Sequence, residues 1–107
     1  MQFLIITRQR TPPPPEMTLP LLGAMQAWMA QHRASGKIKS SWAFAGMPGG
    51  GGVIEVDSAE ELDEIMAGFP LGPFSSIEVL ALSDFDRNIE AVKVAFGRMM
   101  EMMGGPR

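Results

Sequence analysis

Two glutamates lie in short apolar runs of this chain, where a carboxylate can act as a proton carrier. Glu78 lies within residues 77–79, and Glu55 lies within residues 53–56. Removal from water raises the pKa of a carboxyl group toward neutrality. Two carboxylates that face one cavity acquire separate pKa values, so one can act as acid and the other as base. If the fold brings both carboxylates to one cavity, the pair could transfer protons.

Arg8 and Trp42 could complete such a site. An arginine can bind a substrate carboxylate, and a tryptophan offers a flat wall for an unsaturated ring. Structural alternatives stay open: Arg8 could pair with Glu78 across neighbouring strands, and Trp42 could belong to the core. Glu55 could be a solvated strand residue near a rim. His32, the only histidine, falls near the end of an amphipathic segment, which is typical of a surface or capping residue.

Four strands and two helices are predicted to position these side chains. Thr18 is expected to cap the first helix, with Pro20 in its first turn and Gly36 as its stop. Ser58 and Glu61 form a capping box that begins the second helix. Runs of apolar and β-branched residues predict strands at 3–7, 38–45, 53–56 and 77–82.

Two low-complexity segments connect these elements. Four prolines at 12–15 predict a stiff connector into the first helix, and an SH3-type ligand is the weaker alternative. Four glycines at 49–52 predict the turn into the third strand. A phosphate-binding loop is disfavoured there because no Gly-Lys-Ser/Thr ending follows and the next element is a strand.

The resulting order, β-α-β-β-α-β, predicts an α+β domain of the ferredoxin-like class over residues 1–103. An added amphipathic helix is expected over residues 86–103, followed by a flexible tail at 104–107. The four methionines near the end of this helix are interpreted as packing residues, with a soft metal site as the alternative. Whether this helix packs on its own subunit or on a neighbour stays open.

A pattern of spaced residues runs through the central half of the chain: Gly36, Trp42, Gly46, Val53, Val56, Ser58, Leu62, Pro70, Leu71, Pro73 and the run Ile77, Glu78 and Val79. In this pattern the chain resembles the muconolactone isomerase family, small proteins that shift a double bond in an unsaturated lactone by moving protons. The resemblance implies the ferredoxin-like fold and a dimeric α/β barrel with a cavity between two sheets. It makes Glu78 the first candidate base and Glu55 the second.

Alternation along the strands supports a barrel made by two subunits. In the first strand both faces are largely apolar, which antiparallel sheets show when both faces are covered. The simplest arrangement places two sheets face to face in a homodimer. The side chains expected to line the cavity and bind the substrate are Leu4, Ile6, Arg8, Ser40 and Trp42, with Phe74 closing one mouth.

The sequence also departs from the family. Family members usually carry histidine, lysine or arginine where this chain has Leu4, Ile6, Ser40, Ala43 and Phe85. Each change removes a proton carrier or a cation from the expected pocket or its rim. These departures argue against muconolactone itself and favour a more apolar substrate.

Two functions are therefore predicted from different classes. The first is a cofactor-independent isomerase or cyclase that moves protons on a largely apolar unsaturated lactone or ketone. The second is a non-catalytic barrel that binds a small ligand or serves as an accessory subunit. A weaker third interpretation is a protein-interaction module that uses the proline run or the methionine-rich tail.

Bulk properties set further limits. A net charge of −3 argues against a nucleic-acid partner, which would need a basic face. The absence of cysteine excludes disulfides and thiolate metal sites and is compatible with the cytoplasm. No segment reaches the ~20 consecutive apolar residues that a membrane span requires.

Overall fold

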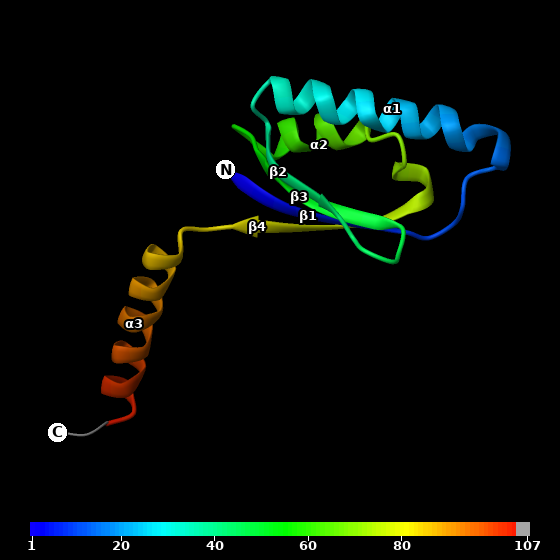
Figure 1. Ribbon diagram of the computed structural model, residues 1–107. Helices are drawn as coiled ribbons and strands as arrows, with labels where there is room; N and C mark the ends of the chain where they lie inside the picture. Colours follow the sequence, from blue (N-terminus) through cyan, green and yellow to red (C-terminus); the bar gives the residue numbers. More distant parts are fainter. Residues whose placement is uncertain (105–107) are drawn as a thin grey trace.

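The computed structural model describes residues 1–104, so the predicted tail lies outside the described part beyond Gly104. The elements follow the predicted order and end in one added helix (Figure 1). They are β1 (Gln2–Gln9), α1 (Pro15–Ala34), β2 (Ile38–Ala43), β3 (Gly49–Glu55), α2 (Ala59–Ala67), the 3-10 turn η1 (Gly72–Phe74), β4 (Ser75–Leu82) and α3 (Phe85–Met102).

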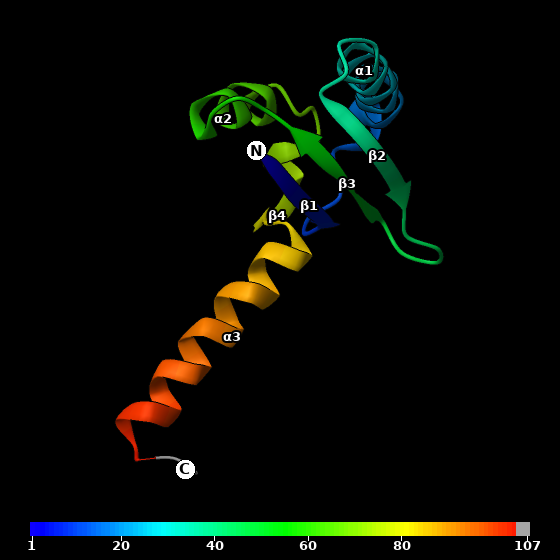
Figure 2. The ribbon, with the colours of Figure 1, turned by 90° about the vertical axis from the view of Figure 1, so that its left-hand side faces the viewer.

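The four strands form one antiparallel sheet in the order β2-β3-β1-β4. Strands β1 and β3 occupy the centre, and the two crossings through α1 and α2 lie on the same face (Figure 2). This arrangement confirms the predicted ferredoxin-like fold.

The core lies between the sheet and the two covering helices. Phe3 and Ile5 of β1 are 7% and 4% exposed, and Ile54 of β3 is 3% exposed. Leu62 and Ile65 pack against them from α2. Ser58 caps α2 as predicted, since its Oγ accepts a hydrogen bond from the Glu61 amide at 3.1 Å. Glu61 Oε1 reaches back to accept from the Asp57 amide at 3.0 Å, one residue before the position of a standard capping box. We call the sheet surface that carries α1 and α2 the helix face, and the opposite surface the open face.

Helix α1 begins earlier than predicted. It starts at Pro15, so Thr18 is an internal residue whose Oγ1 donates to the Pro14 carbonyl at 3.3 Å. A proline at the first position of a helix loses no hydrogen bond, because that amide has no intrahelical acceptor. Pro20 consequently lies inside the helix. The proline run therefore ends in the helix that it was expected to precede.

The four glycines at 49–52 belong to β3, and the prediction of a turn there is wrong. Strand β2 ends at Ala43, and the hairpin turns through residues 44–48, where Gly46 has a φ of 79°. The glycines are needed for close approach to the neighbouring strands. A Cβ at Gly52, for example, would lie 2.7 Å from the Ser40 carbonyl oxygen.

Helix α3 projects away from the rest of the molecule, so that the chain measures 70 × 28 × 23 Å (Figure 1). Asp84 caps it, with Oδ2 accepting from the Arg87 amide at 3.0 Å. None of the described side chains of α3 is buried. Across residues 1–104, no helix combines the length and apolarity that crossing a membrane would require.

Candidate functional site

The strand register brings most of the predicted site residues together on the open face. Glu78 of β4 pairs with Ile6 of β1, Ile6 pairs with Gly51 of β3, and Gly51 pairs with Trp42 of β2. These four residues form one row across the whole sheet. Neighbouring strands are about 4.8 Å apart, so about 14 Å separates the backbones of Glu78 and Trp42.

The neighbouring row contributes apolar surface and one hydroxyl. Leu80 pairs with Leu4, Leu4 pairs with Val53, and Val53 pairs with Ser40. Leu4 and Ile6 are half-buried, while Leu80 is 44% exposed. The two rows present an uncovered apolar surface with a carboxylate at one edge and an indole at the other.

Trp42 lies over the glycine in its own row. A Cβ built on Gly51 would be 3.0 Å from Trp42 Nε1, so the indole occupies the space that a side chain at position 51 would fill. Trp42 is nevertheless 43% exposed. Part of the ring is therefore available to stack on a ligand.

Glu78 has a cationic neighbour on the same face. Its Oε1 lies 3.6 Å from Nη1 of Arg8, and both side chains are about half exposed, at 53% each. Arg8 pairs with Ser76 in the register, so the ion pair is diagonal between β1 and β4. This is the cross-strand pairing that the sequence offered as the structural alternative for Glu78.

Glu55 is held by a hydrogen bond at the end of the open face. Gln2 Nε2 donates to Glu55 Oε2 at 2.7 Å. This hydrogen bond lowers the pKa of Glu55 below its usual value, and the charges of Lys39 and the N-terminus act in the same direction. A general base near neutral pH would need the opposite shift. The single chain therefore keeps Glu55 as an ionised acceptor.

Phe74 does not join the other predicted residues. It lies in η1 and lines a pocket on the helix face. It lies there because the chain turns through residues 72–74 at the edge of the helix layer before β4 begins. Its position at a mouth of a cavity between two subunits stays a prediction.

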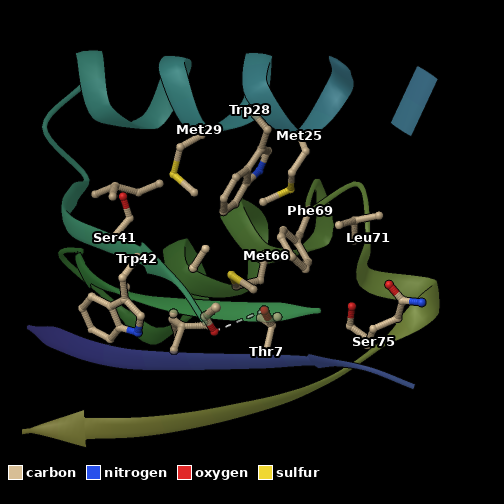
Figure 3. Close-up of a pocket in the computed structure, with 18 of the residues that line it drawn as sticks. Thr7, Met25, Trp28, Met29, Ser41, Trp42, Met66, Phe69, Leu71 and Ser75 are labelled. Atoms are coloured by element: carbon tan, nitrogen blue, oxygen red, sulfur yellow. Dashed lines mark hydrogen bonds between the residues drawn. The ribbon is translucent and has the colours of Figure 1, made fainter. Parts of the chain in front are cut away.

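The pocket that Phe74 lines lies between α1 and the sheet and has a volume of about 460 Å³ (Figure 3). It exists because the helix-facing positions of β3 include Gly50 and Gly52, which place no side chain beneath α1. Its apolar wall comes from both helices, the sheet and the segment around η1. The apolar lining residues with large side chains are Ile5, Leu22, Met25, Trp28, Met29, Ile38, Trp42, Ile54, Met66, Phe69, Leu71 and Phe74.

Trp28 contributes to this wall an indole ring whose orientation is fixed by its contacts. Its Nε1 donates to the Ile65 carbonyl at 3.3 Å. The ring makes edge contacts with His32 and Phe69 at centroid distances of 4.9 and 5.2 Å. His32 itself does not appear among the residues that line the pocket within the described chain. The indole is therefore held in one orientation while one side of it faces the pocket.

The pocket lining also includes polar side chains, and two of them donate hydrogen bonds. Arg33 Nη2 donates to Ser41 Oγ at 2.7 Å. Thr7 Oγ1 donates to the Gly50 carbonyl at 3.3 Å (Figure 3). Gln9 and Ser75 complete the polar lining. Among the described residues, no aspartate, glutamate or histidine lines it. The pocket can bind a ring with an oxygen substituent, but it has no carboxylate or imidazole to move a proton.

The pocket that Met25, Trp28 and Met29 line was not predicted from the sequence. The signal that could have revealed it is the glycine run, which becomes informative only once it is placed in a strand. Within residues 1–104 no cluster of three His, Asp or Glu side chains could hold a metal ion.

The fold and these two regions define a class: an α+β protein with a ferredoxin-like sheet, an apolar pocket under its first helix and a charged apolar open face. The sequence model of the family described as muconolactone delta-isomerase matches residues 1–88. That match spans everything except most of α3. The chain belongs to the muconolactone delta-isomerase family.

Individual relatives agree with this membership. Muconolactone delta-isomerase of Acinetobacter baylyi is 34% identical over 58 residues, which is 54% of this chain and 60% of the relative. Muconolactone delta-isomerase of Rhodococcus opacus is 29% identical over 65 residues, which is 61% of this chain and 70% of the relative. The aligned part thus spans less than two thirds of the first relative's length.

Two solved structures share the fold. A muconolactone isomerase superposes with a TM-score of 0.72 at 24% identity, covering 78% of this chain and 90% of that chain. A 5-chloro-2-hydroxyhydroquinone dehydrochlorinase from Burkholderia phenoliruptrix AC1100, in complex with 2,5-dihydroxybenzoquinone, gives 0.63 at 19% identity. It covers 81% of this chain and 98% of that chain. At these identities the likeness establishes the fold alone.

Proposed function

We propose that this chain is a cofactor-independent isomerase or lyase that moves a proton on a small, largely apolar, unsaturated ring compound. The observation that carries the proposal is the family match over residues 1–88, which includes both the open-face row and the pocket. The curated relatives are named as isomerases that act on a lactone, and one similar structure is named as a dehydrochlorinase of a hydroxylated ring. Proton transfer beside a conjugated carbonyl is the step common to such reactions.

Glu78 is the proposed base. It would take the proton beside the carbonyl and return it at the far end of the shifted double bond, while Arg8, 3.6 Å away, would stabilise the developing enolate oxygen. Trp42, Ser40, Leu4 and Ile6 would line the site. Glu55, kept ionised by Gln2, is assigned a supporting electrostatic role.

This site requires a cover, because Glu78 is half exposed in the single chain. A second copy seated on the open face would remove water from around the carboxylate and make it a stronger base. We therefore propose a homodimer in which two open faces meet, the arrangement expected from the two-sided apolar strands. Leu80 and Leu82, which are 44% and 42% exposed, would be covered at the same time.

The proposed reaction class can be tested directly with purified full-length protein in heavy water. Unsaturated lactones and aromatic ketones would be incubated with the protein in the presence of EDTA, and deuterium uptake would be followed by mass spectrometry. Catalysed uptake that EDTA leaves unchanged is the expected result. Uptake no faster than with heat-denatured protein, for every compound including muconolactone, would contradict the proposal.

A second candidate function is favoured by the composition of the pocket. Because none of the residues from 1 to 104 that line the pocket under α1 carries a carboxylate or an imidazole, this pocket is suited to holding an apolar ring without changing it. In a Trp42→Phe background, saturable quenching of Trp28 by an aromatic ketone that is recovered unchanged would favour this function. Met29→Phe should then weaken the binding by filling the pocket. Quenching without saturation would count against it.

A further inference from the structure

Helix α3 carries an apolar stripe that the described residues, 1–104, leave without cover. The stripe repeats at alternating spacings of three and four residues, which keeps its members on one side of a helix. Individual exposures run from 39% at Ile89 to 75% at Met103. The stripe consists of Phe85, Ile89, Val92, Phe96, Met99 and Met103.

The direction of α3 places this stripe next to the open face. Figures 1 and 2 show α3 leaving the end of β4 on the side opposite to α1 and α2. Only Ser83 and Asp84 separate the strand from the helix. The exposed side chains of Leu80 and Leu82 therefore continue into Phe85 along the chain. A partner molecule bound to the open face would lie beside α3.

The charge of α3 argues for a protein occupant. The helix contains three basic residues, Arg87, Lys93 and Arg98, and three acidic ones, Asp86, Glu90 and Glu101. An amphipathic helix that binds an anionic membrane surface has instead a polar side rich in Lys and Arg. The balanced polar side fits a soluble partner.

The area that a stable interface requires favours a second copy of this chain as the occupant of the open face. A stable interface takes about 800 Å² from each partner. One side of a helix of this length, about 27 Å, presents only on the order of 300 Å². The open face must supply the remainder. A twofold arrangement uses both surfaces twice, since the α3 and the open face of each copy are offered to the other.

We propose that the apolar stripe of α3 docks on a second copy of this chain seated against the open face, and that the second copy's α3 docks reciprocally on the first. We call α3 in this role the clasp. It extends the interface between the two copies beyond residues 1–88, the part that matches the family model. This inference concerns assembly and goes beyond the proposed reaction.

Two valines on α3 provide a matched pair for testing the clasp. Val92 lies in the stripe and Val94 lies on the far side of the same helix, and they are 52% and 54% exposed in the single chain. Val92→Glu should raise the dimer dissociation constant by about tenfold or more, because it buries an unpaired carboxylate in an apolar contact. Val94→Glu should leave it unchanged. Sedimentation velocity over a concentration series measures both, and equal effects of the two variants would overturn the proposal.

Hydrogen exchange on the wild-type full chain gives a second test without any substitution. Amides of α3 should exchange more slowly at concentrations where the dimer forms than after dilution below its dissociation constant. Exchange of α3 that does not depend on concentration, while the protein remains a dimer, would overturn the clasp and leave the open-face dimer standing. A monomer at every concentration would overturn both.

Discussion

Glu78 and Arg8 lie close enough, at 3.6 Å between Oε1 and Nη1, for each to influence what the other can do. The ion pair and the proposed catalytic role of Glu78 are compatible. An enolate oxygen of the substrate could bind the Arg8 guanidinium while the Glu78 carboxylate accepts the proton. Around them the open face has few polar groups, since the neighbouring positions of β1 on this face are Leu4 and Ile6. The row could be predicted from alternation along the strands, because side chains two residues apart share a face.

The pair formed by Lys37 and Glu61 offers a pH test at the residue scale. Lys37 Nζ lies 2.9 Å from Glu61 Oε1, and this hydrogen bond lowers the pKa of Glu61 below 4.5 while it raises that of Lys37 above 10.5. A depressed carboxyl pKa stabilises the folded state above the unfolded value, and the stabilisation is lost as the pH falls through the folded value. The stabilising effect of the raised lysine pKa is lost as the pH rises through its folded value.

Glu61→Gln should therefore melt at a lower temperature than the wild type at pH 7, and the difference should shrink as the pH falls below 4.5. Glu64→Gln, on the exposed side of α2, is the matched control and should follow the wild type throughout. Thermal unfolding by circular dichroism measures both variants. A Glu61→Gln difference that persists unchanged into strong acid would contradict the assignment.

At the scale of elements, the capped helix α2 and the apolar strands could be predicted because their signals are local. Ser58 and Glu61 are three residues apart, and the β-branched runs identify their own strands. The place of the four glycines at 49–52 within β3 could not be predicted from such local signals. Glycine is common in turns, and only the packing of β3 between β1 and β2 shows that these positions need a missing Cβ. The pocket depends on that placement, so it could not be predicted either.

The requirement for glycine in β3 can be measured against a permissive glycine in the same chain. A Cβ at Gly52 would lie 2.7 Å from the Ser40 carbonyl oxygen, whereas a Cβ at Gly23 in α1 meets nothing within 4 Å. Gly52→Ala should destabilise the fold by about 1–3 kcal/mol because the strands must separate. Gly23→Ala should stabilise it by about 0.5–1 kcal/mol because alanine favours helix. Urea unfolding compares the two, and a neutral Gly52→Ala would contradict the account of β3.

At the scale of the whole molecule, the described chain leaves two apolar surfaces without cover. One helix layer covers one face of the sheet, the other face is uncovered, and α3 extends away from both (Figure 1). Two-sided apolar alternation predicted that the open face needs a partner. The direction of α3 could not be predicted, because an amphipathic pattern shows that a helix needs cover without showing where the cover lies.

Two adjacent residues of β4 can separate the faces in an assembly experiment. Leu80 pairs with Leu4 on the open face, and Val79 pairs with Ile5 on the helix face, with exposures of 44% and 45%. Leu80→Glu should yield a monomer, while Val79→Glu should keep the oligomeric state of the wild type. Light scattering coupled to size-exclusion chromatography distinguishes the outcomes. A dimer with Leu80→Glu would show that the open face is not the interface.

Glu78 on the open face is proposed to move the proton, and comparing Glu78→Gln with Glu60→Gln tests this role most directly. The control residue is an exposed glutamate on the outer side of α2. Deuterium incorporation into a substrate of the wild type would be followed for each folded, dimeric variant. We expect Glu78→Gln to lose about 10²- to 10⁴-fold in rate and Glu60→Gln to match the wild type. Full incorporation by Glu78→Gln would exclude Glu78 as the base and contradict this proposal.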